Sequence, residues 1–133
     1  MVTIFIDTSA MFALVNSADK DSSAAWDVWK ASTERGDEFL TNNYVMVECV
    51  ALIQNRLGLP VVQRLLDSVA PLLHIAWVDQ DQHEASINHV LSASRRNLSL
   101  VDCSAFETMR RLGLDTAFTF DEHFRDEGFK VIP

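Results

Sequence analysis

The hydrophobic pattern of the chain begins with a short apolar run that stops abruptly at an acid. Ile4 to Ile6 is rich in β-favouring residues and ends at Asp7. Ala10 to Leu14 then favours helix, and Thr8 and Ser9 are residue types that commonly cap a helix. The pattern therefore predicts a buried strand followed directly by a helix, with Asp7 at the junction.

The same pattern predicts that strands and helices alternate along the rest of the chain. We expect strands over 38–41, 72–78, 116–120 and 129–132, helices over 22–34, 44–57, 59–70, 80–96 and 98–112, and a helical turn over 122–127. Such alternation is typical of a mainly parallel sheet with helices on both faces. The chain has 133 residues, of which 48% are apolar, which suits one core. We therefore expect a single α/β domain over residues 1–133.

The predicted helix over 44–57 contains an isolated acid. Its first part, 44–53, is apolar on nearly every side, so we expect that part to be buried almost all round. Glu48 is the only charged residue there, and no basic residue lies within one turn of it. An unpartnered buried carboxylate is costly, so Glu48 needs a cation, a hydrogen-bond donor or a proton. A structural role, in which Glu48 reaches a distant arginine or a helix end, fits this helix equally well.

Composition limits the classes of function. A net charge of −8, from 19 acids and 11 bases, argues against nucleic-acid binding by general attraction to phosphates. Clustered acids that hold divalent cations can neutralise phosphates locally, so a polyanionic substrate stays compatible with this charge. No apolar run approaches the roughly 20 residues of a membrane span, and we expect a cytoplasmic protein without a membrane segment. Cys49 and Cys103 match neither a zinc site nor a disulfide framework, and we expect buried thiols.

Four acids are expected to meet at one edge of the predicted sheet. Asp7 and Asp121 each follow a strand, Asp102 lies in the first turn of a helix, and Glu48 can reach the same edge. Such acids repel one another unless they are protonated or bridged by hard cations, and oxygen-rich sites suit Mg²⁺ or Mn²⁺. Ser99 and Asp102 also have the spacing of a capping box, so a purely structural Asp102 stays open.

These positions occur in the order of a known family's motifs. They are Asp7-Thr8-Ser9, Glu48 in a helix after an Asn-containing turn, Ser99-x-x-Asp102, Thr119-Phe120-Asp121 with Phe124 beyond, and the closing segment Gly-Phe-Lys-Val-Ile-Pro. With them the chain resembles the PIN-domain ribonucleases, and among these the VapC-type toxins of prokaryotic toxin–antitoxin systems. The resemblance implies a PIN-like three-layer α/β/α sandwich with a central, mainly parallel five-stranded sheet.

The resemblance also implies a function. It implies an Mg²⁺- or Mn²⁺-dependent endoribonuclease that hydrolyses RNA phosphodiester bonds and acts as the toxin of a type II toxin–antitoxin pair. Family members commonly form homodimers, and an antitoxin protein silences them by packing over the helices near the site. Ser22-Ser23 stands where many relatives have a histidine, which leaves partner and subfamily open. By their motif positions, the catalytic, metal-binding acids would be Asp7, Glu48, Asp102 and Asp121, and the supporting hydroxyl groups Ser9 and Thr119.

Other classes of protein fit part of the pattern. A PIN-like binding or regulatory module would keep the fold without nuclease activity, and it would bind neither Mg²⁺ nor Mn²⁺. Phosphatases also place an aspartate after the first strand, but they need a second one where this chain has Ser9, and receiver domains need a further acid pair and a late lysine. His83 and His89 lie six apart, whereas the zinc metalloprotease pair lies four apart, so they predict no zinc site.

Overall fold

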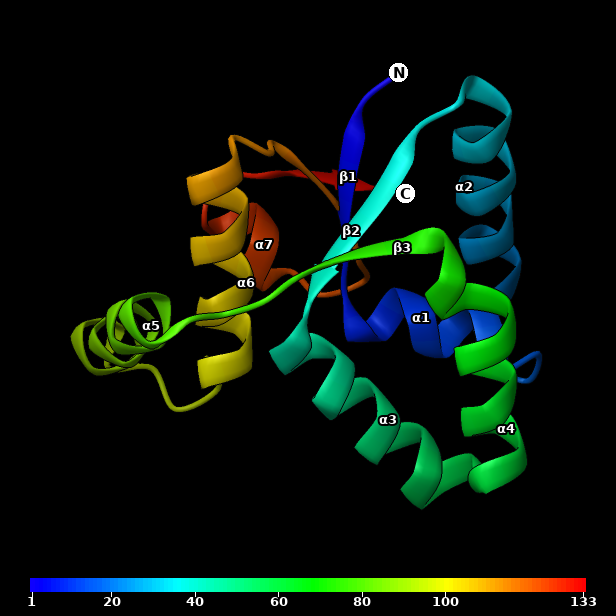
Figure 1. Ribbon diagram of the computed structural model, residues 1–133, viewed down its shortest axis with the longest axis horizontal. Coiled ribbons are helices and arrows are strands. Elements are labelled where there is room, and N and C mark those ends of the chain that lie inside the picture. The colour runs from blue at the N-terminus through cyan, green and yellow to red at the C-terminus, as the bar shows by residue number, and fades with distance from the viewer.

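The computed structural model describes residues 1–133 and contains one five-stranded sheet in which all neighbouring strands are parallel (Figure 1). The strand order is β3-β2-β1-β4-β5. The strands are β1 (Thr3–Ile6), β2 (Glu38–Asn42), β3 (Leu73–Ala76), β4 (Thr116–Phe118) and β5 (Lys130–Ile132). Every predicted strand is present, but β3 and β4 each end two residues earlier than expected. In β4 the reason is that the backbone after Phe118 turns so that the hydroxyl of Thr119 accepts from the amide of Asp121, at 3.0 Å.

Helices cover both faces of this sheet, so the predicted three layers are present. Figure 1 shows α5, α6 and α7 on one side and α1, α2 and α4 on the other. No helix combines the length and the apolar character that a membrane span requires. The helices are α1 (Thr8–Val15), α2 (Ser22–Arg35), α3 (Asn43–Leu57), α4 (Leu59–Arg64), α5 (Gln80–Ala93), α6 (Leu100–Leu112) and α7 (His123–Asp126), with a π-helical turn η1 (Leu65–Val69) and a 3-10 turn η2 (Ala70–Leu72) after α4.

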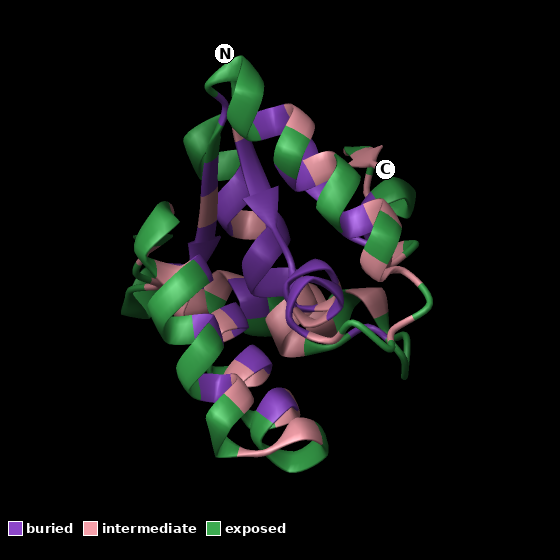
Figure 2. Cartoon of the chain, turned by 90° about the vertical axis from the view of Figure 1, so that its right-hand side faces the viewer, coloured by how far each residue is buried: buried purple, intermediate pink, exposed green.

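The central strand β1 is the centre of the core. Its residues Ile4 to Ile6 are at most 1% exposed, because strands pair on both edges of β1 and helices cover both faces. Because both faces of β1 are buried, polar residues do not alternate with apolar ones in this run. Figure 2 shows that buried residues concentrate in the central strands and α1, whereas the outer helices carry exposed faces. Cys49 and Cys103 are buried free thiols, as predicted.

Helix α3 is not buried all round, and this prediction was wrong. Val45, Cys49 and Ile53 are buried, but Val47 on another face of the helix is 70% exposed. The helix packs on α1, α4 and α6 with one side, and its apolar residues elsewhere face solvent. These residues line a groove of ≈ 490 Å³, which we name the α3 groove; its lining residues are Met46, Val47, Val50, Ala51, Gln54 and Leu66.

A buried polar network fixes α3 relative to α6. The side chain of Asn42 caps α3 by accepting from the amide of Val45, at 2.8 Å. Its Nδ2 donates to the hydroxyls of Ser104 and Thr108 on α6, at 3.2 and 3.0 Å. Gln82 on α5 donates to the same Thr108 hydroxyl, at 2.6 Å. Because such a network is fully hydrogen-bonded, it holds three helices and the end of β2 in one arrangement.

Candidate active site

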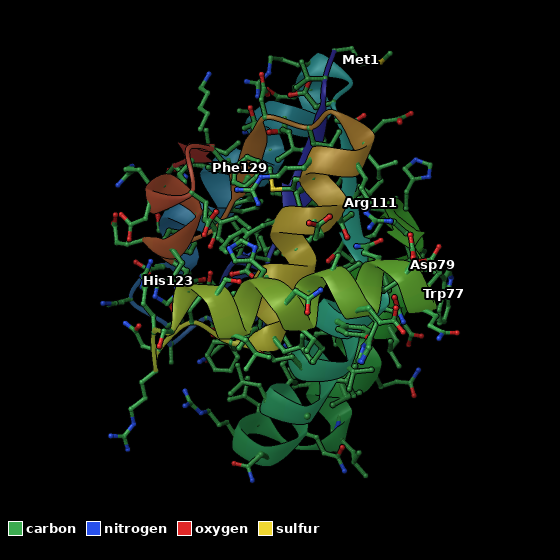
Figure 3. All side chains as sticks on the ribbon, turned by 90° about the vertical axis from the view of Figure 1, so that its left-hand side faces the viewer. Met1, Trp77, Asp79, Arg111, His123 and Phe129 are labelled. Carbon is green, nitrogen blue, oxygen red and sulfur yellow. The ribbon has the colours of Figure 1, made fainter.

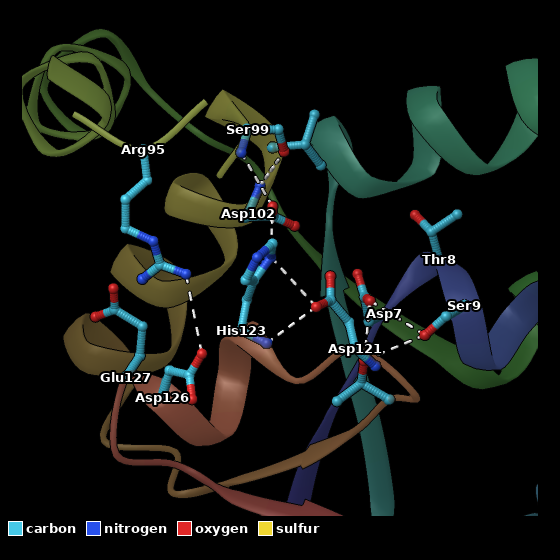
Figure 4. Close-up of polar contacts among 12 residues, drawn as sticks. Asp7, Thr8, Ser9, Arg95, Ser99, Asp102, Asp121, His123, Asp126 and Glu127 are labelled. Atoms are coloured by element: carbon cyan, nitrogen blue, oxygen red, sulfur yellow. Dashed lines mark hydrogen bonds and ion pairs between the residues drawn. The ribbon is translucent and has the colours of Figure 1, made fainter. Parts of the chain in front are cut away.

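The four predicted acids come together at the carboxyl ends of β1 and β4. These strands are parallel neighbours, and the amide of Asp7 donates to the carbonyl of Phe118, at 3.1 Å. The charges of Asp102 and Asp121 act on both Asp7 and Glu48 and raise the pKa of each. Figure 4 shows Asp7, Asp102 and Asp121 around one small region of the molecule.

Asp7 is the most buried acid of the cluster, at 5% exposure. Its Oδ2 accepts from the hydroxyl of Thr119 at 3.0 Å and from that of Ser9 at 3.3 Å. Burial raises the pKa of Asp7 to about 7, hydrogen bonds offset part of this, and the charges of Asp102 and Asp121 raise it further. The ionised form that a cation requires is therefore destabilised while no cation is bound.

Ser9 and Thr119 connect the end of β4 to Asp7. The hydroxyl of Ser9 accepts from the amide of Phe120 at 2.9 Å, and the hydroxyl of Thr119 accepts from the amide of Asp121 at 3.0 Å. Each hydroxyl therefore has its hydrogen free to donate to the carboxylate of Asp7. The prediction that Ser9 caps helix α1 was wrong, because its hydroxyl makes these contacts between segments distant in sequence instead.

Glu48 receives its hydrogen bond from Thr8. The hydroxyl of Thr8 donates to Oε1 of Glu48 at 2.7 Å, so Thr8 does not cap α1 either. No lysine or arginine forms an ion pair with Glu48, which contradicts the distant-arginine alternative. Partial burial raises the pKa of Glu48, the hydrogen bond from Thr8 opposes this, and nearby acidic charges add to the rise. A donor is thus present, but a balancing positive charge is not.

Asp102 has the structural role that its spacing allowed, and it also faces the cluster. Its Oδ2 accepts from the amide of Ser99 at 3.0 Å, and the hydroxyl of Ser99 accepts from the amide of Asp102 at 3.0 Å. This capping box begins α6 and fixes the carboxylate in place. The same Oδ2 lies 3.4 Å from Nδ1 of His123, so the cap does not remove Asp102 from the cluster.

The sequence prediction missed His123, which lies between two of the acids. Its Nδ1 is 3.4 Å from Oδ2 of Asp102 and 3.2 Å from Oδ1 of Asp121 (Figure 4). One ligand atom from each of these three residues lies within 4.8 Å of the other two. Figure 3 shows that His123 belongs to α7, which lies beside α6. The sequence did contain a signal: His123 comes two residues after Asp121, an acid that follows a strand. A tight turn at this point can bring the histidine side chain back beside the acid.

Two arginines of the chain pair with acids outside the set of four. Arg95 pairs with Asp126 at 3.9 Å (Figure 4), and Arg110 pairs with Glu127 at 2.6 Å. The donor set of the cluster is therefore carboxylate oxygen with one imidazole, and its negative charge lacks a lysine or arginine partner. Such a set fits a divalent cation. Burial, with the charges of nearby acids, raises the pKa of Cys49 to about 12, so this neighbouring thiol stays protonated.

The chain matches a known protein family. A family model described as PIN domain matches residues 4–130. The chain is 28% identical over 127 residues, 95% of each sequence, to a Mycobacterium tuberculosis (strain CDC 1551 / Oshkosh) protein named 23S rRNA-specific endonuclease VapC20.

Solved structures show the same fold. The crystal structure of Mycobacterium tuberculosis VapC20, described as a Sarcin-Ricin loop cleaving toxin, has a TM-score of 0.87 at 27% identity and covers 98% of this chain and 99% of that chain. VapBC2 from Rickettsia felis, bound to a DNA fragment from its promoter, has a TM-score of 0.72 at 10% identity over 98% and 97% of the two chains. FitAcB from Neisseria gonorrhoeae has a TM-score of 0.68 at 16% identity over 100% and 97%. The last two are similar in fold alone.

Proposed function

This chain belongs to the PIN domain family, and on that premise we propose that it is a divalent-metal-dependent endoribonuclease, with residues 1–133 as one PIN-like domain. It acts as the toxin of a type II toxin–antitoxin pair. The observation that carries the proposal is the meeting of four acids from separate parts of the chain without a lysine or arginine to balance them. Folding gathers such charges at a cost unless protons or cations compensate.

Hydroxyl groups or a helix cap hold three of the four acids in this proposal. Asp7, Glu48, Asp102 and Asp121 hold Mg²⁺ or Mn²⁺. When bound, such an ion supplies a Lewis acid for the phosphate oxygens and makes water more acidic. The chain's own groups position the acids: the hydroxyls of Ser9 and Thr119 hold Asp7, that of Thr8 holds Glu48, and the capping box at Ser99 holds Asp102.

The proposed substrate is RNA, which binds at the cluster of four acids where the divalent cation binds. The relative VapC20 is named for 23S rRNA and is described as cleaving the Sarcin-Ricin loop. For this chain we propose a single-stranded or looped RNA as the substrate, and the cytoplasm as the place of cleavage. A net charge of −8 gives little general attraction to phosphates, so binding depends on the local site rather than on a basic surface.

The α3 groove is the proposed place for an antitoxin. Five of its six lining residues are apolar, and Val47 among them is 70% exposed. Exposed apolar residues that group together in this way mark interaction sites. Val47 also lines a second cavity of ≈ 410 Å³ together with Glu48, so a protein seated in the groove reaches the acids. Solved relatives include a toxin-antitoxin complex from Klebsiella pneumoniae. A homodimer, as is common in the family, is the second assembly that we propose.

The function is tested by cleavage of a looped RNA with Asp7→Asn. We expect wild-type protein to cleave with Mg²⁺ or Mn²⁺ and to stop with a chelator, and the variant to lose cleavage. Asp27→Asn removes the same charge from an exposed position of α2 and serves as the matched control. Undiminished cleavage by Asp7→Asn, after removal of contaminating nucleases, contradicts the assignment. Absence of binding at millimolar Mg²⁺ and Mn²⁺ in calorimetry favours the alternative, a PIN-like binding module.

A further inference from the structure

We propose that His123 is a nitrogen ligand of the cation site and that it makes the site prefer Mn²⁺ over Mg²⁺. The inference rests on the proposed function, because it concerns the same cation. His123 begins α7, and its amide donates to Oδ1 of Asp121 at 2.9 Å. This turn brings the imidazole back over the acids, where its side chain is 14% exposed.

The Nδ1 atom of His123 is buried and makes no hydrogen bond. A buried polar atom without a partner is destabilising, so such atoms are rare in folded proteins. The structure offers Nδ1 two carboxylate oxygens, at 3.4 Å from Asp102 and 3.2 Å from Asp121, in poor geometry for a hydrogen bond. A cation shared with these oxygens gives Nδ1 the partner that the chain itself does not.

The other histidines differ from His123 in this respect. His83 has Tyr44 as its hydrogen-bond partner, and Nε2 of His89 lies 3.1 Å from Glu127. His74 is exposed on β3. Each of these three histidines contacts a protein partner or solvent away from the acidic cluster. His123 is therefore the histidine whose unpaired ring nitrogen lies at the cluster.

The distances around Nδ1 suit atoms that share one ion. Ligands at about 2.1 Å from a common ion lie about 3.0 Å apart when they are adjacent in an octahedron and about 3.4 Å apart in a tetrahedron. The separations of 3.2 and 3.4 Å between Nδ1 and the two carboxylate oxygens fall in this range. The three ligand atoms lie within 4.8 Å of one another, so a single cation can draw them together.

Nitrogen coordination changes which ion the site prefers. Mg²⁺ takes oxygen ligands and keeps waters, whereas transition-metal ions accept imidazole readily. The acids Asp7, Glu48, Asp102 and Asp121 alone bind either ion, and the added nitrogen favours the transition metal. His123 is thus the position at which this chain sets its metal preference.

The direct test is pulsed electron paramagnetic resonance of Mn²⁺ bound to the metal-stripped full-length protein. We expect ¹⁴N coupling from a directly bound nitrogen, replaced by ¹⁵N coupling when histidine is isotopically labelled. Tightly bound Mn²⁺ without nitrogen coupling overturns the role of His123 and leaves the proposed nuclease intact. Failure of the protein to bind Mn²⁺ overturns the inference, and failure to bind Mg²⁺ as well overturns the proposed metal site.

Calorimetry with His123→Gln provides the second test. We expect the Kd for Mn²⁺ to rise about tenfold or more, and the Kd for Mg²⁺ to change less than about threefold. His74→Gln is the matched control and should leave both values unchanged. Equal changes for the two ions contradict a nitrogen ligand and indicate a role in positioning Asp102 and Asp121. If His123→Gln does not fold, the pulsed electron paramagnetic resonance spectrum of the wild-type protein alone decides whether His123 binds the cation.

Discussion

Replacing Asp7 by asparagine should stabilise the metal-free protein while it abolishes RNA cleavage. Burial raises the pKa of Asp7 from 3.8 to about 7, so the folded state binds the proton more tightly than the unfolded state does. Stability of the metal-free protein therefore falls as the pH rises from about 4 to about 7. A shift of roughly three pKa units corresponds to about 4 kcal/mol of lost stability at pH 8.

Asparagine removes this charge and keeps the shape of the side chain. Its amide oxygen can accept from Thr119 and Ser9 as the carboxylate does, but its amide hydrogens need new partners, and this offsets part of the gain. We expect the variant to be more stable than wild type by about 1–3 kcal/mol at pH 8 in chelator, which raises Tm by about 3–10 °C. At pH 4 the two proteins should differ little, because Asp7 is then protonated.

Divalent cations should reverse the order of stability. An ion at 1,000 times its Kd stabilises the folded wild type by about 4.1 kcal/mol, which exceeds the expected advantage of the variant, and the variant, which lacks a ligand, gains much less. The assay is thermal unfolding followed by circular dichroism at several pH values, in chelator and in excess Mn²⁺. Asp27→Asn controls for the loss of one surface charge. The reasoning is refuted if Asp7→Asn is less stable than wild type at pH 8 in chelator, or if their difference does not depend on pH.

Three further substitutions test other parts of the site. Thr8→Val removes the only hydroxyl that donates to Glu48, and we expect cleavage to fall about tenfold with little change in Tm; unchanged cleavage would show that this bond does not position the acid. Asn42→Ala removes a helix cap and two buried hydrogen bonds, so chemical denaturation should show a loss of about 2–4 kcal/mol, clearly more than for Asn43→Ala. Val47→Lys should weaken antitoxin binding in calorimetry at least about tenfold while metal-dependent cleavage persists, and equal binding would place the antitoxin elsewhere.

Much of the fold follows from local sequence signals. The apolar run before Asp7, the cap at Asn42 and the spacing of Ser99 and Asp102 each depend on neighbours within a few residues. Such signals determined all five strands and the starts of the main helices. The carboxyl ends of parallel strands lie at the same edge of a sheet. The local signals therefore also predicted that Asp7 and Asp121 lie close together.

The partners of the functional side chains were decided by the tertiary structure. Thr8 and Glu48 lie 40 residues apart in sequence, and Ser9 and Phe120 lie 111 apart, so local propensity assigned the two hydroxyls to a helix cap that they do not form. His123 lies only two residues after Asp121, but its second carboxylate, that of Asp102, comes from another helix, so the sequence did not show that the imidazole lies between two acids.

Burial of α3 shows the same limit. Its apolar residues specified a helix but not which face would pack, and Val47 stayed exposed. The sequence by itself determined the elements and the positions of the acids along them, because backbone preference and hydrophobic periodicity act between near neighbours. The exposed face of α3, the hydroxyl donors and the imidazole between two carboxylates were decided only when packing brought distant segments into contact, because burial and charge interactions depend on distance in space.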